Sequence, residues 1–452
     1  MENTSAATQP HANRWLVIFG TALVQIAVGS FYAWAIFNNG FQLISGGELN
    51  KVTGKIVGGL PAGSVSFTFT IGMLFLALGT LIGIPLSKRF GIKIVGIVSA
   101  ILYGLSIMGL TLVGKGSSIW LLWLFGGVLL GLLDGLLYMM TLTNAIKWFP
   151  ERKGLISGIS VACYGLGSLI FKYIDQGIAG GSGKAWGKIT DLNIDHVLLW
   201  WGIIALVFAL VGSFFLKDAP VEDAPAGAAV SDKENFTAPE MLKTSQAYMI
   251  FFTLVTASMF MGLLGAAVTN IAALGTQPAD KVITWGGLPA AAMFVAVVAV
   301  LNTLGRFIMG TLSDYIGRKG VFFITFTIQL VALAALLFTK PGTMSMTMMY
   351  VVIGAMAFCF GGNITVFPTF VADYYGIKNS ARNYSIIYQG FGVGALVVGF
   401  LMASGNPLNP AKVAYSDGAV LTQNFTLSYW VLLIMVILSL IIFLVIRKPE
   451  KR

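Results

Sequence analysis

Long apolar stretches recur along the whole chain, and they constrain its fold more than any other feature. A helix needs about 20 consecutive, mostly apolar residues to cross the hydrocarbon core of a bilayer. Twelve segments of the 452-residue chain meet this requirement. They predict an all-α polytopic membrane protein with twelve transmembrane helices, at 15–38, 64–87, 92–113, 117–146, 154–176, 197–216, 246–273, 284–312, 320–338, 344–367, 380–403 and 425–446.

Composition supports this class and excludes others. Hydrophobic residues make up 57% of the chain and charged residues only 10%, which is far from a soluble domain. The net charge of +10 is explained better by basic cytoplasmic loops than by nucleic acid, so no nucleic acid partner is expected. With two cysteines and two histidines, neither a disulfide framework, a metal site nor a cofactor is expected.

The distribution of basic residues predicts the orientation. Lysine and arginine near the span ends and in the loops number eighteen on the side of the N-terminus and eight on the other side. Cytoplasmic loops carry the excess of positive charge in membrane proteins. Both termini are therefore expected in the cytoplasm.

The chain divides into two similar parts. Residues 1–216 and 246–452 each hold six predicted spans, and residues 217–245 form a polar, Pro- and Ala-rich cytoplasmic linker. Phe149-Pro150 closes the fourth predicted span as Phe367-Pro368 closes the tenth, and Tyr164-Gly-Leu-Gly resembles Gln389-Gly-Phe-Gly. Repeated six-helix halves favour a substrate site near the midplane and alternating access by rocking.

Arg306 lies inside the eighth predicted span. A guanidinium in hydrocarbon costs about 3 kcal/mol or more, so it usually has a function. Its planar fork of donors matches a carboxylate in bidentate fashion. The alternative is a structural ion pair with a buried acid such as Asp134.

Several polar side chains fall at a depth similar to that of Arg306. At about 1.5 Å of rise per residue, Arg306 lies ~12 Å from Asp314, near the end of its span, and Tyr138 and Tyr164 lie ~15 Å from their span ends. Tyr388 and Asn302 fall at a similar level. We expect the tyrosines to offer hydroxyl donors and aromatic walls, although aromatic residues also simply pack helices. Asn302, one turn before Arg306, is expected to bond substrate or to orient the guanidinium.

The segment Gly310-Thr-Leu-Ser-Asp314-Tyr-Ile-Gly317-Arg318-Lys319 resembles the signature loop of the major facilitator superfamily. Its logic is a tight turn at Gly317 with Asp314 at a helix end near basic residues, which can latch the cytoplasmic gate. The corresponding segment of the first half is 84–93. There Lys88 stands at the position of Asp314, where the family usually has an acid. Any latch there must differ.

Further motifs resemble the oxalate/formate antiporter family of bacterial carboxylate carriers, and most closely its branch of pyruvate and monocarboxylate transporters. These motifs are Lys147-Trp-Phe-Pro-Glu-Arg-Lys-Gly154, Tyr164-Gly-Leu-Gly167 and Ser380-Ala-Arg-Asn-Tyr384. The resemblance implies a multi-pass protein of the bacterial inner membrane. It also implies that Arg306, Tyr138 and Tyr164 line the substrate cavity, with Tyr32, Trp34 and Phe360 as further wall positions.

One departure from the family narrows the substrate. The oxalate carrier of the family has a second essential cation, a lysine in its eleventh span, and the matching position here is Phe391. Burying an unpaired second negative charge costs several kcal/mol. We therefore expect a monocarboxylate such as pyruvate, lactate or formate rather than oxalate.

Asp134 is the second ionisable group predicted deep in a span, one turn from Tyr138. A desolvated carboxyl suits a proton carrier. It is also explained as an ion-pair partner or as a neutral, hydrogen-bonded acid. The coupling mode stays open between proton symport and anion exchange.

The sequence thus predicts a secondary active transporter for a small monocarboxylate that works by alternating access as a monomer in the bilayer. Its partners are the carboxylate and a co-transported proton or an exchanged anion. No nucleophile–base set or nucleotide loop is apparent, so we expect no enzyme. The alternatives are an oxalate/formate-type dicarboxylate exchanger, a channel and a non-transporting carboxylate sensor.

Overall fold

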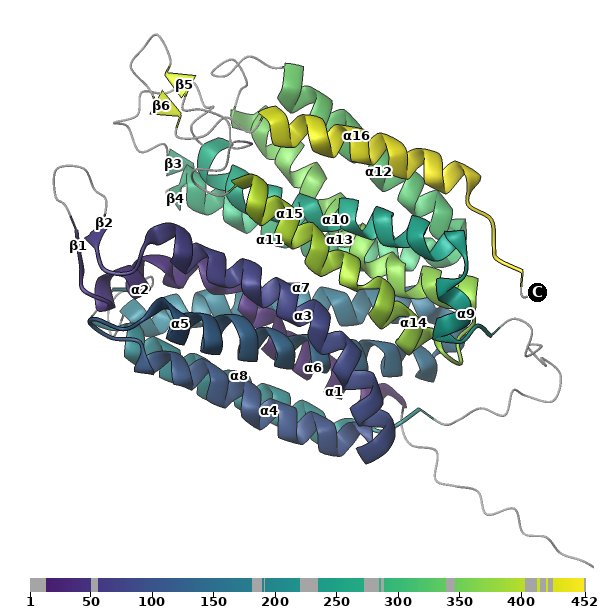
Figure 1. Cartoon of the computed structure of the whole chain (residues 1–452), viewed down its shortest axis with the longest axis horizontal. Coiled ribbons are helices and arrows are strands. Elements are labelled where there is room, and N and C mark those ends of the chain that lie inside the picture. The colour runs from purple at the N-terminus through teal and green to yellow at the C-terminus, as the bar shows by residue number, and fades with distance from the viewer. Residues whose placement is uncertain are drawn as a thin grey trace, which may run out of the picture.

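The protein is a bundle of long helices that run roughly parallel to one axis (Figure 1). The computed structural model describes residues 14–49, 56–180, 189–190, 192–219, 235–271, 284–285, 288–338, 346–402, 413–414, 420–421 and 426–450. Both the start of the first helix and the end of the last lie at one end of the bundle, which we call the terminal end. The opposite end carries three short strand pairs, β1–β2, β3–β4 and β5–β6, and we call it the hairpin end.

The first half of the chain forms one group of helices, drawn in purple and blue in Figure 1. The first span is continued by a 3-10 segment, and the fourth contains a π-helical segment. The elements are α1 (Arg14–Gly29), η1 (Ser30–Phe37), α2 (Asn38–Ile44), β1 (Gly47–Leu49), β2 (Ile56–Gly58), α3 (Ala62–Phe90), α4 (Ile92–Gly109), η2 (Leu110–Leu112), α5 (Ile119–Leu122), η3 (Trp123–Leu129), α6 (Leu130–Trp148), η4 (Pro150–Arg152), α7 (Lys153–Gly180) and α8 (Ile194–Phe215).

The second half forms the other group, drawn in teal, green and yellow. A short helix, α9, precedes its first long helix. The elements are α9 (Ala238–Leu242), α10 (Ser245–Ile271), β3 (Thr284–Trp285), β4 (Leu288–Pro289), α11 (Ala290–Ile316), α12 (Arg318–Phe338), α13 (Met346–Tyr375), α14 (Ser380–Ile387), α15 (Gln389–Met402), β5 (Val413–Ala414), β6 (Val420–Leu421) and α16 (Thr426–Val445).

The helices have the length and composition of membrane spans. Within the described residues, ten segments qualify as spans by both criteria. The helices α10 and α11 are 27 residues long each and stand where the seventh and eighth spans are predicted. Exposed apolar side chains form stripes at helical spacing, as Ile94, Val98, Ile101 and Leu105 do along α4. A bilayer, rather than water, accounts for such stripes.

Three predicted spans differ from the observed helices. The eighth begins at 290 rather than 284, because Thr284 and Trp285 pair with Leu288 and Pro289 as strands. The tenth does not end at Phe367-Pro368, because α13 continues through Pro368 to Tyr375. A helix tolerates an internal proline at the loss of one backbone hydrogen bond when packing holds it on both sides. The eleventh is interrupted at Tyr388, between α14 and α15.

A glycine turn is repeated in the two halves. Gly91 separates α3 from α4 at φ of 80°, and Gly317 separates α11 from α12 at φ of 79°. Residues with a Cβ atom rarely adopt such a positive φ, so glycine at these two positions allows the sharp turn. The tight turn predicted at Gly317 is confirmed.

Close helix contact within the first half depends on glycine, which has no side chain. A Cβ atom at Gly135 of α6 would lie 1.8 Å from the carbonyl oxygen of Leu76 in α3. That oxygen belongs to the backbone, so it cannot move aside as a flexible side chain would. The two helices are therefore held together at backbone distance.

This contact predicts that Gly135→Ala is destabilising. Forcing a methyl group into such a contact typically costs about 1–3 kcal/mol, so the thermal midpoint of the purified protein in detergent should fall clearly. Gly177→Ala in α7 is the matched control, because a Cβ atom there meets nothing within 4 Å. An unchanged midpoint for Gly135→Ala would show that α3 and α6 are not packed this closely.

Candidate functional site

Arg306 lies in α11, inside the bundle, with only 4% of its surface exposed. Its Nε donates to Oδ1 of Asn302 at 2.7 Å, and its Nη1 donates to the carbonyl oxygen of Val161 in α7, also at 2.7 Å. The second bond joins the two halves of the chain. The Nη2 atom has no hydrogen-bond partner among the described residues, which leaves this nitrogen with its two N–H groups for a ligand.

Asn302 fixes the orientation of this guanidinium. Its Nδ2 donates to the carbonyl oxygen of Ala357 in α13 at 3.3 Å, while its Oδ1 accepts from Arg306. The amide is thus held by two partners and cannot turn without losing one. Of the two roles predicted for Asn302, the geometry favours orienting Arg306.

Five aromatic rings form a continuous cluster beside Arg306, the central aromatic cluster. The Tyr164 ring centroid lies 5.8 Å from Cζ of Arg306. The ring centroids of neighbouring members lie 5.2 Å (Tyr32–Tyr164), 5.1 Å (Tyr138–Tyr164), 5.6 Å (Tyr138–Tyr388) and 5.0 Å (Tyr388–Phe391) apart. The structure therefore brings together predicted site residues from the first, fourth, fifth, eighth and eleventh spans.

Asp134 lies within this cluster and is fully buried. Its Oδ2 accepts a hydrogen bond from the Tyr164 hydroxyl at 2.9 Å, and its Oδ1 has no partner among the described residues. It forms no ion pair with Arg306, whose partners are Asn302 and Val161. The alternative of a structural Arg306–Asp134 pair is therefore wrong in this conformation.

Trp34 and Phe360, the two other residues expected to line the cavity, are not members of the central aromatic cluster. Trp34 stacks on Phe41 at 5.4 Å between ring centroids and covers Gly126, so it packs within the first half. Phe360 is buried in α13. The next residue, Gly361, approaches the Asn302 backbone, where a Cβ would lie 2.1 Å from the Asn302 carbonyl oxygen.

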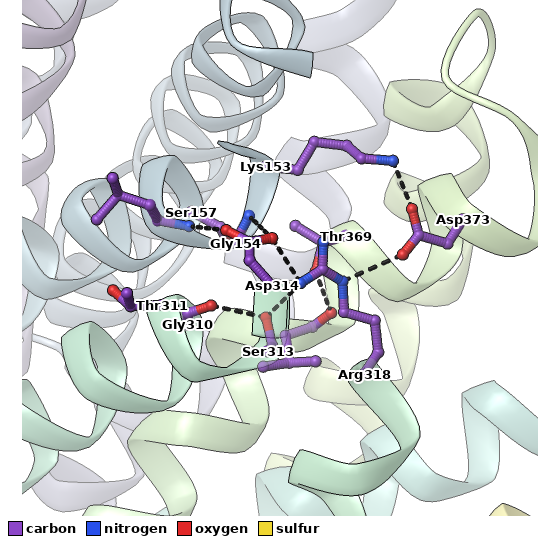
Figure 2. Close-up of polar contacts among 12 residues, drawn as sticks. Lys153, Gly154, Ser157, Gly310, Thr311, Ser313, Asp314, Arg318, Thr369 and Asp373 are labelled. Atoms are coloured by element: carbon purple, nitrogen blue, oxygen red, sulfur yellow. Dashed lines mark hydrogen bonds and ion pairs between the residues drawn. The ribbon is translucent and has the colours of Figure 1, made fainter. Parts of the chain in front are cut away.

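The signature loop forms a latch at the terminal end (Figure 2). Oδ1 of Asp314 accepts from the backbone N–H of Gly154 at 3.0 Å, and Oδ2 accepts from that of Leu155 at 2.9 Å. A carboxylate at a helix N-terminus satisfies free N–H groups and complements the helix dipole. Arg318 also pairs with Asp314 at 2.7 Å. The predicted acid and its basic neighbour thus connect α11 to the start of α7.

Asp373 extends this latch and was not predicted. It pairs with Lys153 from the first half and, at 3.1 Å, with Nε of Arg318. It lies beyond the predicted tenth span, which ends at 367, in a stretch where we expected no helix. Lys319 was wrongly grouped with the latch, because its Nζ donates to the carbonyl oxygen of Ile446 at 2.7 Å.

Helices α7 and α11 approach each other closely above the latch. A Cβ atom at Gly310 would lie 2.8 Å from Cα of Gly158. Ser157 of α7 also donates to the carbonyl oxygen of Thr365 in α13, at 2.6 Å. The contact surface from Asp314 up to Arg306 is the first seam between the halves.

A second seam joins α3 to α14 and α15. Arg382 donates to the carbonyl oxygen of Leu81 at 3.0 Å, and Gln389 donates to that of Ala77 at 2.7 Å. These contacts differ from the acid-based latch, as Lys88 led us to expect.

Loss of the Asp314 carboxylate is predicted to loosen the terminal end. Asp314→Ala removes a helix cap, typically about 1 kcal/mol, and so should shift the population toward separated halves by roughly fivefold. The measurement is the rate of maleimide labelling of Ser160→Cys, a fully buried position, after Cys163 and Cys359 are replaced. Glu151→Ala is the control, because its half-exposed pair with Arg14 contributes little. Equal labelling rates for Asp314→Ala and Glu151→Ala would contradict the latch.

Comparison with known proteins places the chain in a family. The sequence profile of the Major Facilitator Superfamily matches residues 14–399 and, in a second match, 250–452. The chain belongs to the Major Facilitator Superfamily: it is a multi-pass membrane transporter and not an enzyme.

Individual relatives agree with this assignment. The uncharacterized MFS-type transporter YhjX of Escherichia coli (strain K12) is 37% identical over 85% of this chain and 86% of its own. The oxalate:formate antiporter of Oxalobacter formigenes is 25% identical over 89% of this chain and 87% of its own. The solved structure of the proton:xylose symporter XylE, bound to 6-bromo-6-deoxy-D-glucose, has a TM-score of 0.70 at 16% identity and covers 97% of this chain and 96% of XylE. At that identity, the likeness to XylE shows the fold alone.

Proposed function

We propose that the protein transports a small monocarboxylate, such as pyruvate, lactate or formate, with Arg306 as the anchor of the carboxylate. One observation carries the proposal. Arg306 is buried among tyrosines, forms no ion pair with a described acid, and keeps one guanidinium nitrogen without a partner. A buried charge of this kind is stabilised by a bound anion.

Arg306 is expected to have two states, one bonded to the Val161 carbonyl oxygen and one released from it. Nη1 of Arg306 is engaged by a backbone carbonyl of the opposite half in the closed seam. When the halves separate, Nη1 is released and becomes available to a ligand as a second nitrogen beside Nη2. A carboxylate then accepts from both nitrogens in the bidentate geometry that guanidinium groups favour.

The surroundings of Arg306 favour one negative charge. Phe391 stacks on Tyr388 at 5.0 Å and extends the aromatic wall. Arg306 is the one cation among the described residues that contacts a ring of the central aromatic cluster. A dianion would bring a second charge without a partner, at a cost of several kcal/mol. The relative named for oxalate and formate supports a carboxylate substrate in general.

We also propose how the protein sits in the membrane. The charge bias places the terminal end, with both chain termini, in the cytoplasm of a bacterial inner membrane. Residues 1–216 and 246–452 act as the two moving halves of a monomer, and residues 217–245 link them. The first and second seams then close the cytoplasmic side of the pathway.

Uptake into proteoliposomes tests the function. Labelled pyruvate, lactate and formate are expected to accumulate with saturation, and unlabelled oxalate should compete poorly with pyruvate. Arg306→Lys keeps the charge but loses the fork and the Nε bond to Asn302, so uptake should fall at least tenfold.

Arg14→Lys, at a half-exposed ion pair, is the matched control and should leave uptake unchanged. Equal uptake by the wild type and Arg306→Lys would remove the anchor role. Competition by oxalate as strong as that by pyruvate would instead favour a dicarboxylate exchanger.

Asp134 is our candidate for proton coupling. Its carboxyl is fully buried, and one of its oxygens has no donor among the described residues. The other oxygen accepts from the hydroxyl of Tyr164, whose ring lies beside the guanidinium of Arg306. Protonation of this carboxyl removes its buried negative charge. In the proposed mechanism, this change accompanies the binding or release of the substrate anion. This arrangement favours symport over simple anion exchange.

The role of Asp134 predicts a selective defect. Asp134→Asn keeps an acceptor for Tyr164 but cannot release a proton, so accumulation driven by a pH gradient should be lost while substrate exchange continues. Asp195→Asn, an exposed acid at the start of α8, is the control. Unchanged pH-driven accumulation in Asp134→Asn would exclude this carboxyl from coupling.

A further inference from the structure

A second guanidinium of the C-terminal half is also held by a carbonyl of the N-terminal half. Nη1 of Arg382, in α14, donates to the carbonyl oxygen of Leu81 in α3 at 3.0 Å. Arg382 is partly buried and forms no ion pair with an acid among the described residues, and its Nε and Nη2 have no partner there. Its charge is thus left uncompensated in this conformation.

The Leu81 carbonyl is available because of a proline. Pro85 lies inside α3, four residues after Leu81, and it has no N–H to donate to that oxygen. Arg382 satisfies the freed acceptor. The bond to a neutral carbonyl is weaker than a bond to a carboxylate, so it is readily exchanged when an anion arrives.

Arg382 stands on a polar face that leads toward the central aromatic cluster. Arg382, Ser385 and Gln389 follow at helical spacing, and Gln389 bonds the carbonyl oxygens of Ala77 and Ser385 at 2.7 and 2.8 Å. Gln389 directly follows Tyr388, a member of the cluster. Arg382 precedes Phe391 by roughly 13 Å of helix, on the terminal side.

We propose that Arg382 is a second carboxylate-binding residue, which the substrate contacts on the terminal side of Arg306 when the halves separate there. This inference rests on the proposed function. Separation of the second seam breaks the Arg382–Leu81 bond and frees the whole fork. A carboxylate that leaves Arg306 then passes to Arg382 before it reaches water, and an entering carboxylate meets Arg382 first.

A purely structural role for Arg382 makes a different prediction. If the residue only closes the seam, then any donor that reaches the Leu81 carbonyl replaces it. Arg382→Gln provides such a donor, since Gln389 already bonds an α3 carbonyl in this way. The same variant removes the positive charge, so it separates closing the seam from binding an anion.

The test is the half-saturation concentration for pyruvate, measured by exchange from each side of oriented membrane vesicles. Protease access to a C-terminal tag identifies the terminal side. Arg382→Gln should raise this concentration about tenfold on the terminal side and leave it unchanged on the hairpin side, since a charge-assisted bond is lost on one side only. Arg382→Lys keeps the charge without the fork and should lie between the wild type and Arg382→Gln.

Gln389→Leu is the matched control, because it removes neighbouring seam bonds without changing charge. It should alter turnover while keeping the ratio of the two half-saturation concentrations. Unchanged values for Arg382→Gln, or an equal rise on both sides, would overturn the inference alone. If the wild type carries neither pyruvate, lactate nor formate, the proposed function fails and this inference fails with it.

Discussion

The hydrogen bond between Arg306 and the Val161 carbonyl is the interaction on which the rest of the structure depends. It places a buried positive charge where the two halves meet, and it uses a donor that a carboxylate also needs. In the proposed mechanism, binding of the carboxylate and closing of the first seam therefore compete for the same nitrogen. Asn302 accepts from Nε and so orients the guanidinium in the closed seam. A transporter needs such a link between ligand and conformation, because a ligand shifts an equilibrium only through unequal affinity for the two states.

The two seams close the terminal end by different means. In the first, a carboxylate of α11 caps the first turn of α7, and an ion-pair network with Asp373 surrounds it. In the second, Arg382 and Gln389 bond to carbonyl oxygens of α3. The halves are thus similar in their helices and unlike in their contacts. Opening of the first seam separates opposite charges, whereas opening of the second exposes an uncompensated cation.

The sequence predicted what depends on one helix and missed what depends on several. Depth follows from rise per residue, so the shared level of Arg306, Tyr138 and Tyr164 was predictable, as was the Asn302–Arg306 pair at one-turn spacing. Rotation about the helix axis and long-range packing were not. Lys319 was therefore assigned to the latch although it points to Ile446, and Asp373 was missed because Pro368 was expected to end its helix. The interruption at Tyr388 has no strong local signal, since no proline is present there.

Three side-chain donors of the C-terminal half bond to backbone acceptors across the seams, and this has a consequence for how the chain tolerates change. The carbonyl oxygens of Val161, Ala77 and Leu81 are present whatever side chains those positions carry. A substitution there that preserves helix and volume keeps the contact intact. The donors Arg306, Arg382 and Gln389 have no such freedom, since their bonds come from their side chains. Across these three contacts, sequence drift is thus restricted on the C-terminal half and permitted on the N-terminal half.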